Sequence, residues 1–289
     1  MAKSGSSYKI SPLNALQHSL ADRADERPKT AWSRIYLCTL LTFSSSVQFT
    51  MFFTSMYPFL RTKDKTVSEG FFGVVITMYS VSQIIASPLL GIWSNQIGKL
   101  KPPLILCNLT MFVGNLIYFL IELFPPEHTR YVMLVSRFIV GIGWAQVGLL
   151  KSFASAASLP EDRTKATAYI TGGVALGVIL GPALQMIFTF IGDGVLLFEF
   201  GDRSFLKLSM FTMPALFTSI FNIFLILLLV FKFQETFVGF ASASKQTDKK
   251  SEDGKESLGP TLPPYDKWAA GVCFAMRFTQ YFIYTNLET

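Results

Sequence analysis

Blocks of mainly apolar residues, each near 20 residues long, recur along this chain and constrain its fold more than any other feature. A helix of about 20 residues crosses the ~30 Å hydrocarbon core of a bilayer and satisfies its backbone hydrogen bonds internally. Composition agrees, because 51% of the residues are hydrophobic and 15% are charged, whereas a soluble domain carries about 25% charged residues. The sequence therefore predicts an all-α integral membrane protein.

The apolar blocks predict six complete spans and the start of a seventh. Residues 1–33 are expected to form a disordered cytosolic tail, residues 34–232 the six-helix bundle, and residues 267–289 an incomplete seventh helix. Residues 233–266 form a hydrophilic cytosolic linker, because they carry too few apolar side chains to build a core. The expected bounds of the six spans are about 35–57 (ended by Pro58), 71–93, 103–123, 131–150, 166–190 and 208–231.

Lysine and arginine are divided unevenly between the two sides of the expected bundle. If the N-terminus is cytosolic, the cytosolic parts carry 17 of the 25 Lys and Arg residues and the opposite parts carry 6, while Arg137 and Arg277 lie inside spans. Excess positive charge marks the cytosolic side, so we expect a cytosolic N-terminus. The net charge of +6 then reflects membrane flanks, and nucleic acid is not an expected partner.

Arg137 lies six residues into the fourth apolar block. A charged side chain at the bilayer centre costs about 2.5–3.5 kcal/mol on insertion scales, so we expect it to face the bundle interior or a wet cavity. Two interpretations stay open: a structural tether for helix ends, or a fixed positive charge that attracts an anion. No Asp or Glu lies well inside the six apolar cores, so proton coupling within this chain would have to use Glu288 in the seventh segment.

The first span has an unusually polar middle that includes Ser45 and Gln48. Hydroxyl groups can bond their own helix backbone, so one interpretation is packing inside the bundle. The other is that this helix lines a water-filled path, with Ser45, Gln48, Arg137 and Glu288 as the candidate transport residues.

The fifth span carries Gly173, Gly177 and Gly181, with Pro182 next in the chain. Residues four apart share one helix face, and small residues let a second backbone approach closely. We therefore predict a helix-packing face there.

Three motifs together resemble the signatures of the major facilitator superfamily. The loop Gly91-Ile92-Trp93-Ser94-Asn95-Gln96-Ile97-Gly98-Lys99-Leu100-Lys101 is similar to the signature between the second and third helices, with Asn95 replacing the usual acid and Gln96 the first base. Arg137 with Gly141 and Gly143 resembles the fourth-helix signature, and the series Gly173 to Pro182 resembles the fifth-helix signature.

The resemblance implies the six-helix N-terminal half of a major facilitator fold, built from two three-helix repeats, plus the start of a seventh helix. It implies a conformational latch at Gly91, Asn95, Gly98 and Lys99, and helix packing at Gly141 and Gly143. In the family's architecture the glycine face of the fifth helix packs across the boundary between halves. We therefore expect that face and the polar side of the first helix to need a partner, either the complementary half or another copy.

Several stretches resemble a lysosomal branch of the family more specifically. They include Ala86-Ser87-Pro88, Tyr131-Val132-Met133-Leu134-Val135 and Asn286-Leu287-Glu288-Thr289, and the resemblance covers residues 32–289. It implies a multi-pass protein of late-endosomal or lysosomal membranes and permeation of an anion, chloride. Two alternatives remain: a carrier of a small organic solute, and a non-transporting fragment that assembles with or regulates a full-length relative.

No catalytic triad, phosphate loop or metal-ligand cluster stands out in the sequence, and the three cysteines lie inside apolar blocks. We therefore expect no enzyme activity, no cofactor and no metal. The expected partners are membrane lipids, a small anion or small solute, and the complementary half or a second copy.

Overall fold

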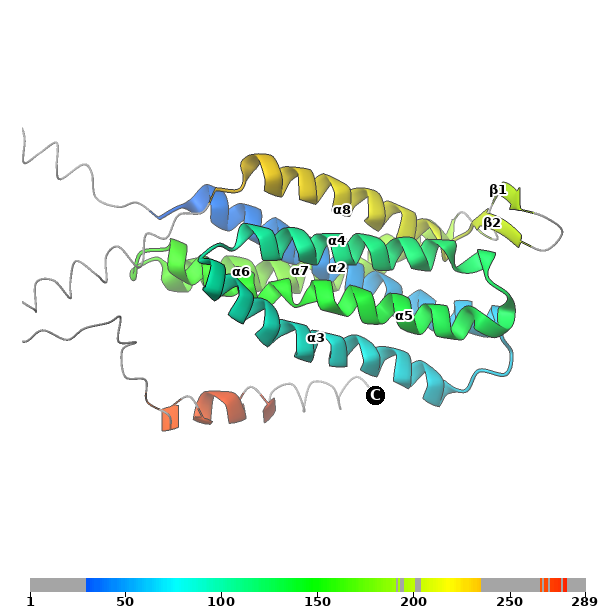
Figure 1. The fold of residues 1–289 in the computed structure, drawn as a ribbon, viewed down its shortest axis with the longest axis horizontal. Coiled ribbons are helices and arrows are strands. Elements are labelled where there is room, and N and C mark those ends of the chain that lie inside the picture. Colours follow the sequence, from blue (N-terminus) through cyan, green and yellow to red (C-terminus); the bar gives the residue numbers. More distant parts are fainter. Residues whose placement is uncertain are drawn as a thin grey trace, which may run out of the picture. The chain divides into compact units, whose positions relative to one another are not determined.

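A computed structural model of the chain confirms a helical membrane fold: within the part of the chain that it describes, six helices are long and apolar enough to cross a bilayer (Figure 1). The structure describes residues 30–190, 192, 195–200, 204–234, 266, 268–269, 271–276 and 278–279. Contacts divide the chain into two units, Met1–Ser244 and Lys245–Thr289. Most of the predicted tail and linker lies outside the described residues.

The first unit is an antiparallel helix bundle followed along the chain as α2 to α8. Its elements are α2 (Trp32–Lys63), α3 (Glu69–Ile97), α4 (Lys101–Phe119), the short 3-10 helix η1 (Leu120–Leu123), α5 (Pro126–Trp144), α6 (Gln146–Ala157), α7 (Arg163–Thr189), β1 (Val195–Phe200), β2 (Ser204–Leu208) and α8 (Met213–Lys232).

Local sequence explains where several helices begin and end. The Ser68 hydroxyl accepts a hydrogen bond from the Phe71 amide and caps the start of α3, and Gly98, at φ 60°, ends it in the left-handed conformation that glycine adopts without strain. The prediction that Pro58 ends the first span is wrong, because α2 continues through Pro58 to Lys63. A proline removes one backbone hydrogen bond, and the burial of Phe59 and Leu60 directly after it offsets that loss.

The fourth predicted span is two helices, α5 and α6, which meet at Ala145. Together they extend to Ala157, seven residues beyond the predicted end at Leu150. The break follows Gly143, whose α-carbon lies so close to α4 that an added methyl group would collide with the Cys107 carbonyl oxygen and the Met111 side chain.

The bundle is held together mainly by α2 against α7, α4 against α5 and α8, and α3 against α5. On α7 the buried Gly173, Gly177 and Gly181 face α2: a Cβ at Gly173 would lie 2.8 Å from the Thr39 carbonyl oxygen, and one at Gly177 would lie 2.6 Å from the Phe43 carbonyl oxygen. Pro182 continues α7 as an internal helix residue.

The expectation that the glycine face awaits a partner outside the six helices is therefore wrong, because α2 already covers it. Gly141 makes a similarly close approach on α5, where a Cβ would collide with the Ser82 hydroxyl and the Tyr79 carbonyl oxygen of α3.

The connection between α7 and α8, predicted only as a loop, contains a two-stranded antiparallel ribbon. Strands β1 and β2 pair with Val195 opposite Leu208 and Phe200 opposite Ser204, and the register shifts between Leu196 and Phe198. Alternation of apolar residues in so short a segment is a weak signal, which is why the sequence did not reveal it.

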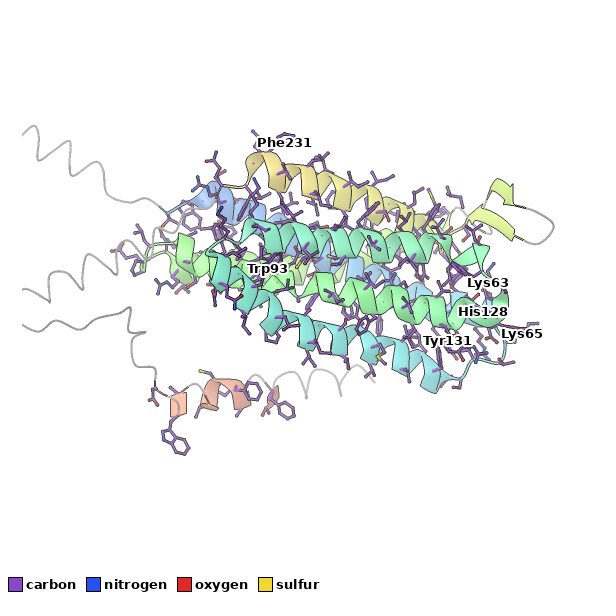
Figure 2. All side chains as sticks on the ribbon, viewed as in Figure 1. Lys63, Lys65, Trp93, His128, Tyr131 and Phe231 are labelled. Atoms are coloured by element: carbon purple, nitrogen blue, oxygen red, sulfur yellow. The ribbon has the colours of Figure 1, made fainter. Side chains whose placement is uncertain are left out.

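Figure 2 shows which residues lie at each of the two ends of the bundle. Lys63, Lys65 and His128 lie at one end, and Trp93 and Phe231 lie toward the other. We call these the Lys63 end and the Gly98 end of the bundle, since the latter also holds Gly98, where α3 stops.

In the second unit, residues 268–269, 271–276 and 278–279 are helical. That residues 267–289 form an incomplete seventh membrane span stays a prediction. The Asp266 carboxylate accepts a hydrogen bond from the Trp268 amide at 2.9 Å, as a helix-capping residue does. Glu288 and Arg277 lie outside the described residues.

Candidate functional site

The middle of the bundle holds a buried network of amide side chains centred on Gln48 of α2. The Gln48 Oε1 atom accepts hydrogen bonds from Asn115 Nδ2 at 2.8 Å and Asn222 Nδ2 at 3.0 Å. Gln48 Nε2 donates to Asn222 Oδ1 at 3.1 Å and to Ser44 Oγ at 3.2 Å. The network therefore joins α2 to α4 and α8.

A second buried network lies one helical turn away, toward the Gly98 end. Gln146, the first residue of α6, donates from Nε2 to Ser45 Oγ at 2.8 Å and accepts from Asn108 Nδ2 at 2.8 Å. Ser45 in turn donates to the Leu41 carbonyl oxygen. This network joins α2, α4 and α6 near the break in the fourth span.

The candidate transport residues Ser45 and Gln48 are thus buried and bonded to other helices. The expectation that the polar side of the first helix would lack partners is wrong for both of them. Their partners were not singled out from the sequence. An amide that recurs inside an otherwise apolar block was the available signal, and it marks Asn108, Asn115, Gln146 and Asn222.

Arg137 of α5 lies in the interior, with 4% of its surface exposed. Its guanidinium carbon stands 4.3 Å from the ring centre of Phe52 and 4.6 Å from that of Tyr118. The aromatic faces attract the cation and replace part of its lost hydration. Nε makes a long hydrogen bond of 3.5 Å to Ser136 Oγ, and Nη2 has no hydrogen-bond partner among the described residues.

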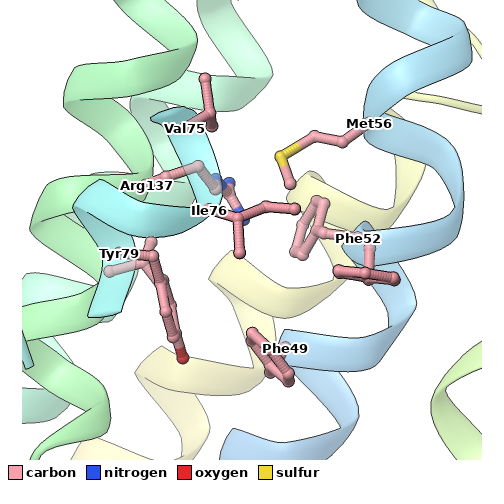
Figure 3. Close-up of a pocket in the computed structure, with 9 residues that line it drawn as sticks. Phe49, Phe52, Met56, Val75, Ile76, Tyr79 and Arg137 are labelled. Carbon is pink, nitrogen blue, oxygen red and sulfur yellow. The ribbon is translucent and has the colours of Figure 1, made fainter. Parts of the chain in front are cut away.

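A small cavity of about 20 Å³ adjoins the guanidinium group. Figure 3 shows the Arg137 nitrogens pointing toward Met56 and Phe52 of α2, with Tyr79 and Phe49 on the side away from Met56. A cavity needs about 10–15 Å³ to hold one water molecule, so this one has room for a single water-sized particle.

The cavity is lined mainly by apolar side chains, and Arg137 and Tyr79 are its polar lining residues. Arg137 Nη2 and the Tyr79 hydroxyl are buried without a hydrogen-bond partner among the described residues, as are the Tyr118 hydroxyl and the Trp144 indole nitrogen, which do not line the cavity. Asp and Glu residues of the described helices lie near helix ends, where Glu122 pairs with Lys63 at 3.4 Å. The described lining therefore offers one positive charge and no carboxylate to a particle in the cavity.

The Lys63 end also carries a compact ionic cluster. Arg130 Nε donates to Asp64 Oδ2 at 2.8 Å, Arg130 Nη2 contacts the same oxygen, and Thr66 donates to Asp64 Oδ1 from its hydroxyl at 2.6 Å and from its amide at 3.0 Å. The hydrogen bond from the Thr66 hydroxyl, with further help from Arg130, lowers the pKa of the Asp64 carboxyl. This cluster fastens the start of α5 to the end of α2.

The four predicted latch residues come together on a groove of about 890 Å³ at the Gly98 end. One wall is the last part of α3 with Gly91 and Asn95, the rim is Gly98 and Lys99, and the other wall is α6. Whether these residues act as a latch stays a prediction.

Comparisons with known proteins give one consistent family. The Major Facilitator Superfamily model matches residues 38–289. The chain is 31% identical over 262 residues to major facilitator superfamily domain-containing protein 8 of Xenopus laevis, covering 90% of this chain and 50% of that protein. It is 28% identical to the synaptic vesicular amine transporter of Bos taurus over 42% of this chain and 22% of that protein.

A solved structure of a D-xylose-proton symporter matches with a TM-score of 0.56 at 18% sequence identity, covering 78% of this chain and 54% of that chain. At this identity the likeness shows the fold alone. The chain spans about half the length of the Xenopus laevis relative and of the symporter chain.

Proposed function

Since the chain belongs to the major facilitator superfamily, we propose that it forms part of a transmembrane pathway for a small anion, with chloride as the first candidate. The observation that carries this proposal is the buried Arg137, which lines a small cavity and whose Nη2 has no hydrogen-bond partner among the described residues. Family membership supports membrane transport in general, and the buried arginine supports a negatively charged solute.

The preference for an anion follows from what surrounds the guanidinium. An unpaired cation at membrane depth costs several kcal/mol, and the two aromatic faces offset only about 2 kcal/mol when desolvated. An anion in the cavity would accept hydrogen bonds from Arg137 and reduce that cost. A cation there would meet a like charge, and none of the described residues that line the cavity supplies a carboxylate to oppose it, so anions are favoured.

We place this activity in late-endosomal or lysosomal membranes, with the N-terminus in the cytosol. Support comes from the stretches that resemble the lysosomal branch and from the excess of Lys and Arg at the expected cytosolic side. The complementary half, or another copy of the chain, is the proposed partner that completes the pathway.

A carrier of a small organic solute is the second candidate. The buried carbonyl oxygens Asn108 Oδ1 and Asn115 Oδ1 lack hydrogen-bond donors among the described residues. They could accept from a hydroxyl or amino group, so a neutral or cationic organic solute would find partners there instead of at Arg137.

The test is flux through proteoliposomes that hold the full chain at matched protein abundance, read by a halide-sensitive dye and by radiolabelled organic solutes. Arg137→Gln removes the charge and should lower halide flux about tenfold or more, and Arg137→Lys should retain part of it because the charge remains. Arg61→Gln, at an exposed position of the Lys63 end, is the control for loss of one charge.

Equal halide flux in Arg137→Gln and the unchanged chain would remove the arginine from the pathway. Flux of an organic solute that is insensitive to Arg137→Gln would favour the second candidate. A folded, reconstituted protein that moves neither class of solute would favour the non-transporting alternative.

A further inference from the structure

The groove at the Gly98 end has chemistry that the anion pathway does not use. Two cationic side chains, Lys99 and Arg163, line it from the α3–α4 loop and from the start of α7. None of the described residues that line the groove is acidic. The Asp162 carboxylate next to Arg163 accepts a hydrogen bond from Thr30 at 2.6 Å and is not part of the lining.

Hydroxyl groups supply neutral hydrogen bonds along both walls. Ser87 and Ser94 line the groove from α3, and Ser152 and Ser155 line it from α6. Ser94 also donates to the Lys99 carbonyl oxygen at 3.1 Å, which holds the loop at the rim. Asn95 contributes an amide, so the groove carries two positive charges and several donors.

Shape and position identify the kind of ligand. The groove lies between helices that cross the membrane, and its rim stands where α3 ends and α7 begins. The rim is therefore at headgroup level, while the walls run inward to Ala145 in the middle of the fourth span. Leu149 adds an apolar surface within the groove. Basic pockets between membrane helices on the cytosolic side bind anionic lipid headgroups.

We propose that this groove binds an anionic phospholipid, with the headgroup phosphate at Lys99 and Arg163 and an acyl chain along the wall of α6. A guanidinium group binds phosphate oxygens through paired N–H donors, and an ammonium group does so as a point charge. Asn95 stands where the family signature usually has an acid, and the bound phosphate would supply the negative charge that is missing there.

The experiment measures lipid binding to the full chain after purification in mild detergent and delipidation. Phosphatidylglycerol and phosphatidylcholine are titrated separately, and binding is read by native mass spectrometry and by the shift in thermal stability. We expect phosphatidylglycerol to bind more tightly than phosphatidylcholine, and Lys99→Gln/Arg163→Gln to weaken phosphatidylglycerol binding about tenfold or more.

Arg61→Gln/Lys65→Gln is the matched control, since it removes the same charge from exposed positions at the opposite end. A second variant tests the groove by shape. A Cβ at Gly148 would have only the Ser87 hydroxyl nearby, at 3.8 Å, so Gly148→Leu fills the groove and keeps both cations. Gly172→Leu, where a Cβ would meet nothing within 4 Å, is its control.

Phosphatidylglycerol must bind more weakly to both groove variants and equally well to both controls. Equal weakening in the charge control, equal affinity for phosphatidylcholine, or undiminished binding in Gly148→Leu would each overturn the proposal. In the last part of the experiment, inorganic phosphate and glycerol phosphate are added as competitors of phosphatidylglycerol. If either displaces phosphatidylglycerol at comparable concentration, the groove binds soluble phosphate esters, and the assignment to a membrane lipid is wrong.

Discussion

Replacing Gly177 by leucine should destabilise the bundle by separating α2 from α7. A Cβ at this position would lie 2.6 Å from both the Phe43 carbonyl oxygen and the Ser46 Cβ, and 3.0 Å from the Val47 amide nitrogen. Carbon atoms normally approach to about 3.5–4.0 Å. The two helices must therefore move apart by about 1 Å even for alanine, and farther for leucine.

The expected cost follows from what that movement breaks. Extra methylene groups in a packed core cost about 1–3 kcal/mol, and the upper value applies here because two of the three nearest atoms belong to the backbone of α2. The movement also lengthens the hydrogen bond from Thr50 Oγ1 to the Gly177 carbonyl oxygen, which is 3.3 Å. A loss of about 3 kcal/mol lowers Tm by about 6–12 °C for a chain of this size.

The assay is thermal unfolding in detergent, read as loss of the monodisperse peak in size-exclusion chromatography. Gly172→Leu is the control on the same helix, because a Cβ there meets nothing within 4 Å, and it should leave Tm within about 2 °C. Equal losses of Tm in the two variants, or no loss in Gly177→Leu, would refute the idea that close backbone approach holds α2 to α7.

Three further predictions concern single contacts. A double-mutant cycle of Gln48→Leu and Asn222→Leu should show a favourable coupling of about 0.6–1.7 kcal/mol in unfolding measurements, and additive effects would mean that the two hydrogen bonds between these side chains do not stabilise the bundle. Tyr118→Leu should lower Tm more than Tyr118→Phe does, since phenylalanine keeps the ring that faces the Arg137 guanidinium; equal losses would argue against the cation–π contact. The lowered pKa of Asp64 stabilises the fold above the unfolded-state pKa of about 3.9, and this stabilisation is lost as pH falls through the folded pKa. Tm should then fall below about pH 4, and Asp64→Asn should show a lower Tm at pH 7 with a smaller acid-induced loss.

Hydropathy predicts the membrane class and the six spans because each span must cover the same hydrocarbon thickness, and that requirement leaves a mark in consecutive residues. The buried position of Arg137 follows from the same cost. The sequence does not predict which helices pack against each other, because contacts between distant helices leave no pattern in consecutive residues. The glycine series predicted a close approach, but α2 could be identified as its partner only from the structure.

The amide networks, too, could be predicted from the sequence only in part. Gln48 stood out because the first span is polar along much of its length, whereas Asn115 and Asn222 lie in apolar blocks and carry no local signal of the contact that each makes with Gln48. The continuation of α2 beyond Pro58 was missed because a proline marks a probable helix end, and tertiary packing of Phe59 and Leu60, both buried, outweighs that local preference.

The pairing of α2 with α7 has a consequence for the time order of biosynthesis. Thr50 bonds a residue 127 positions later in the chain, and Thr42 bonds one 128 positions later. A ribosome that adds about 5–20 residues per second completes that distance in roughly 6–25 s. During this interval the two hydroxyls bond carbonyl oxygens of their own helix, Thr42 that of Thr39 and Thr50 that of Ser46. The Gln48 Oε1 atom, however, has its donors among the described residues only in Asn115 and Asn222, 67 and 174 positions later, and lipid offers none. We therefore expect the nascent first helix to stay beside the translocation machinery until a later span supplies a donor to Gln48, so that the early part of the chain remains a client of the insertion apparatus for longer than its own synthesis takes.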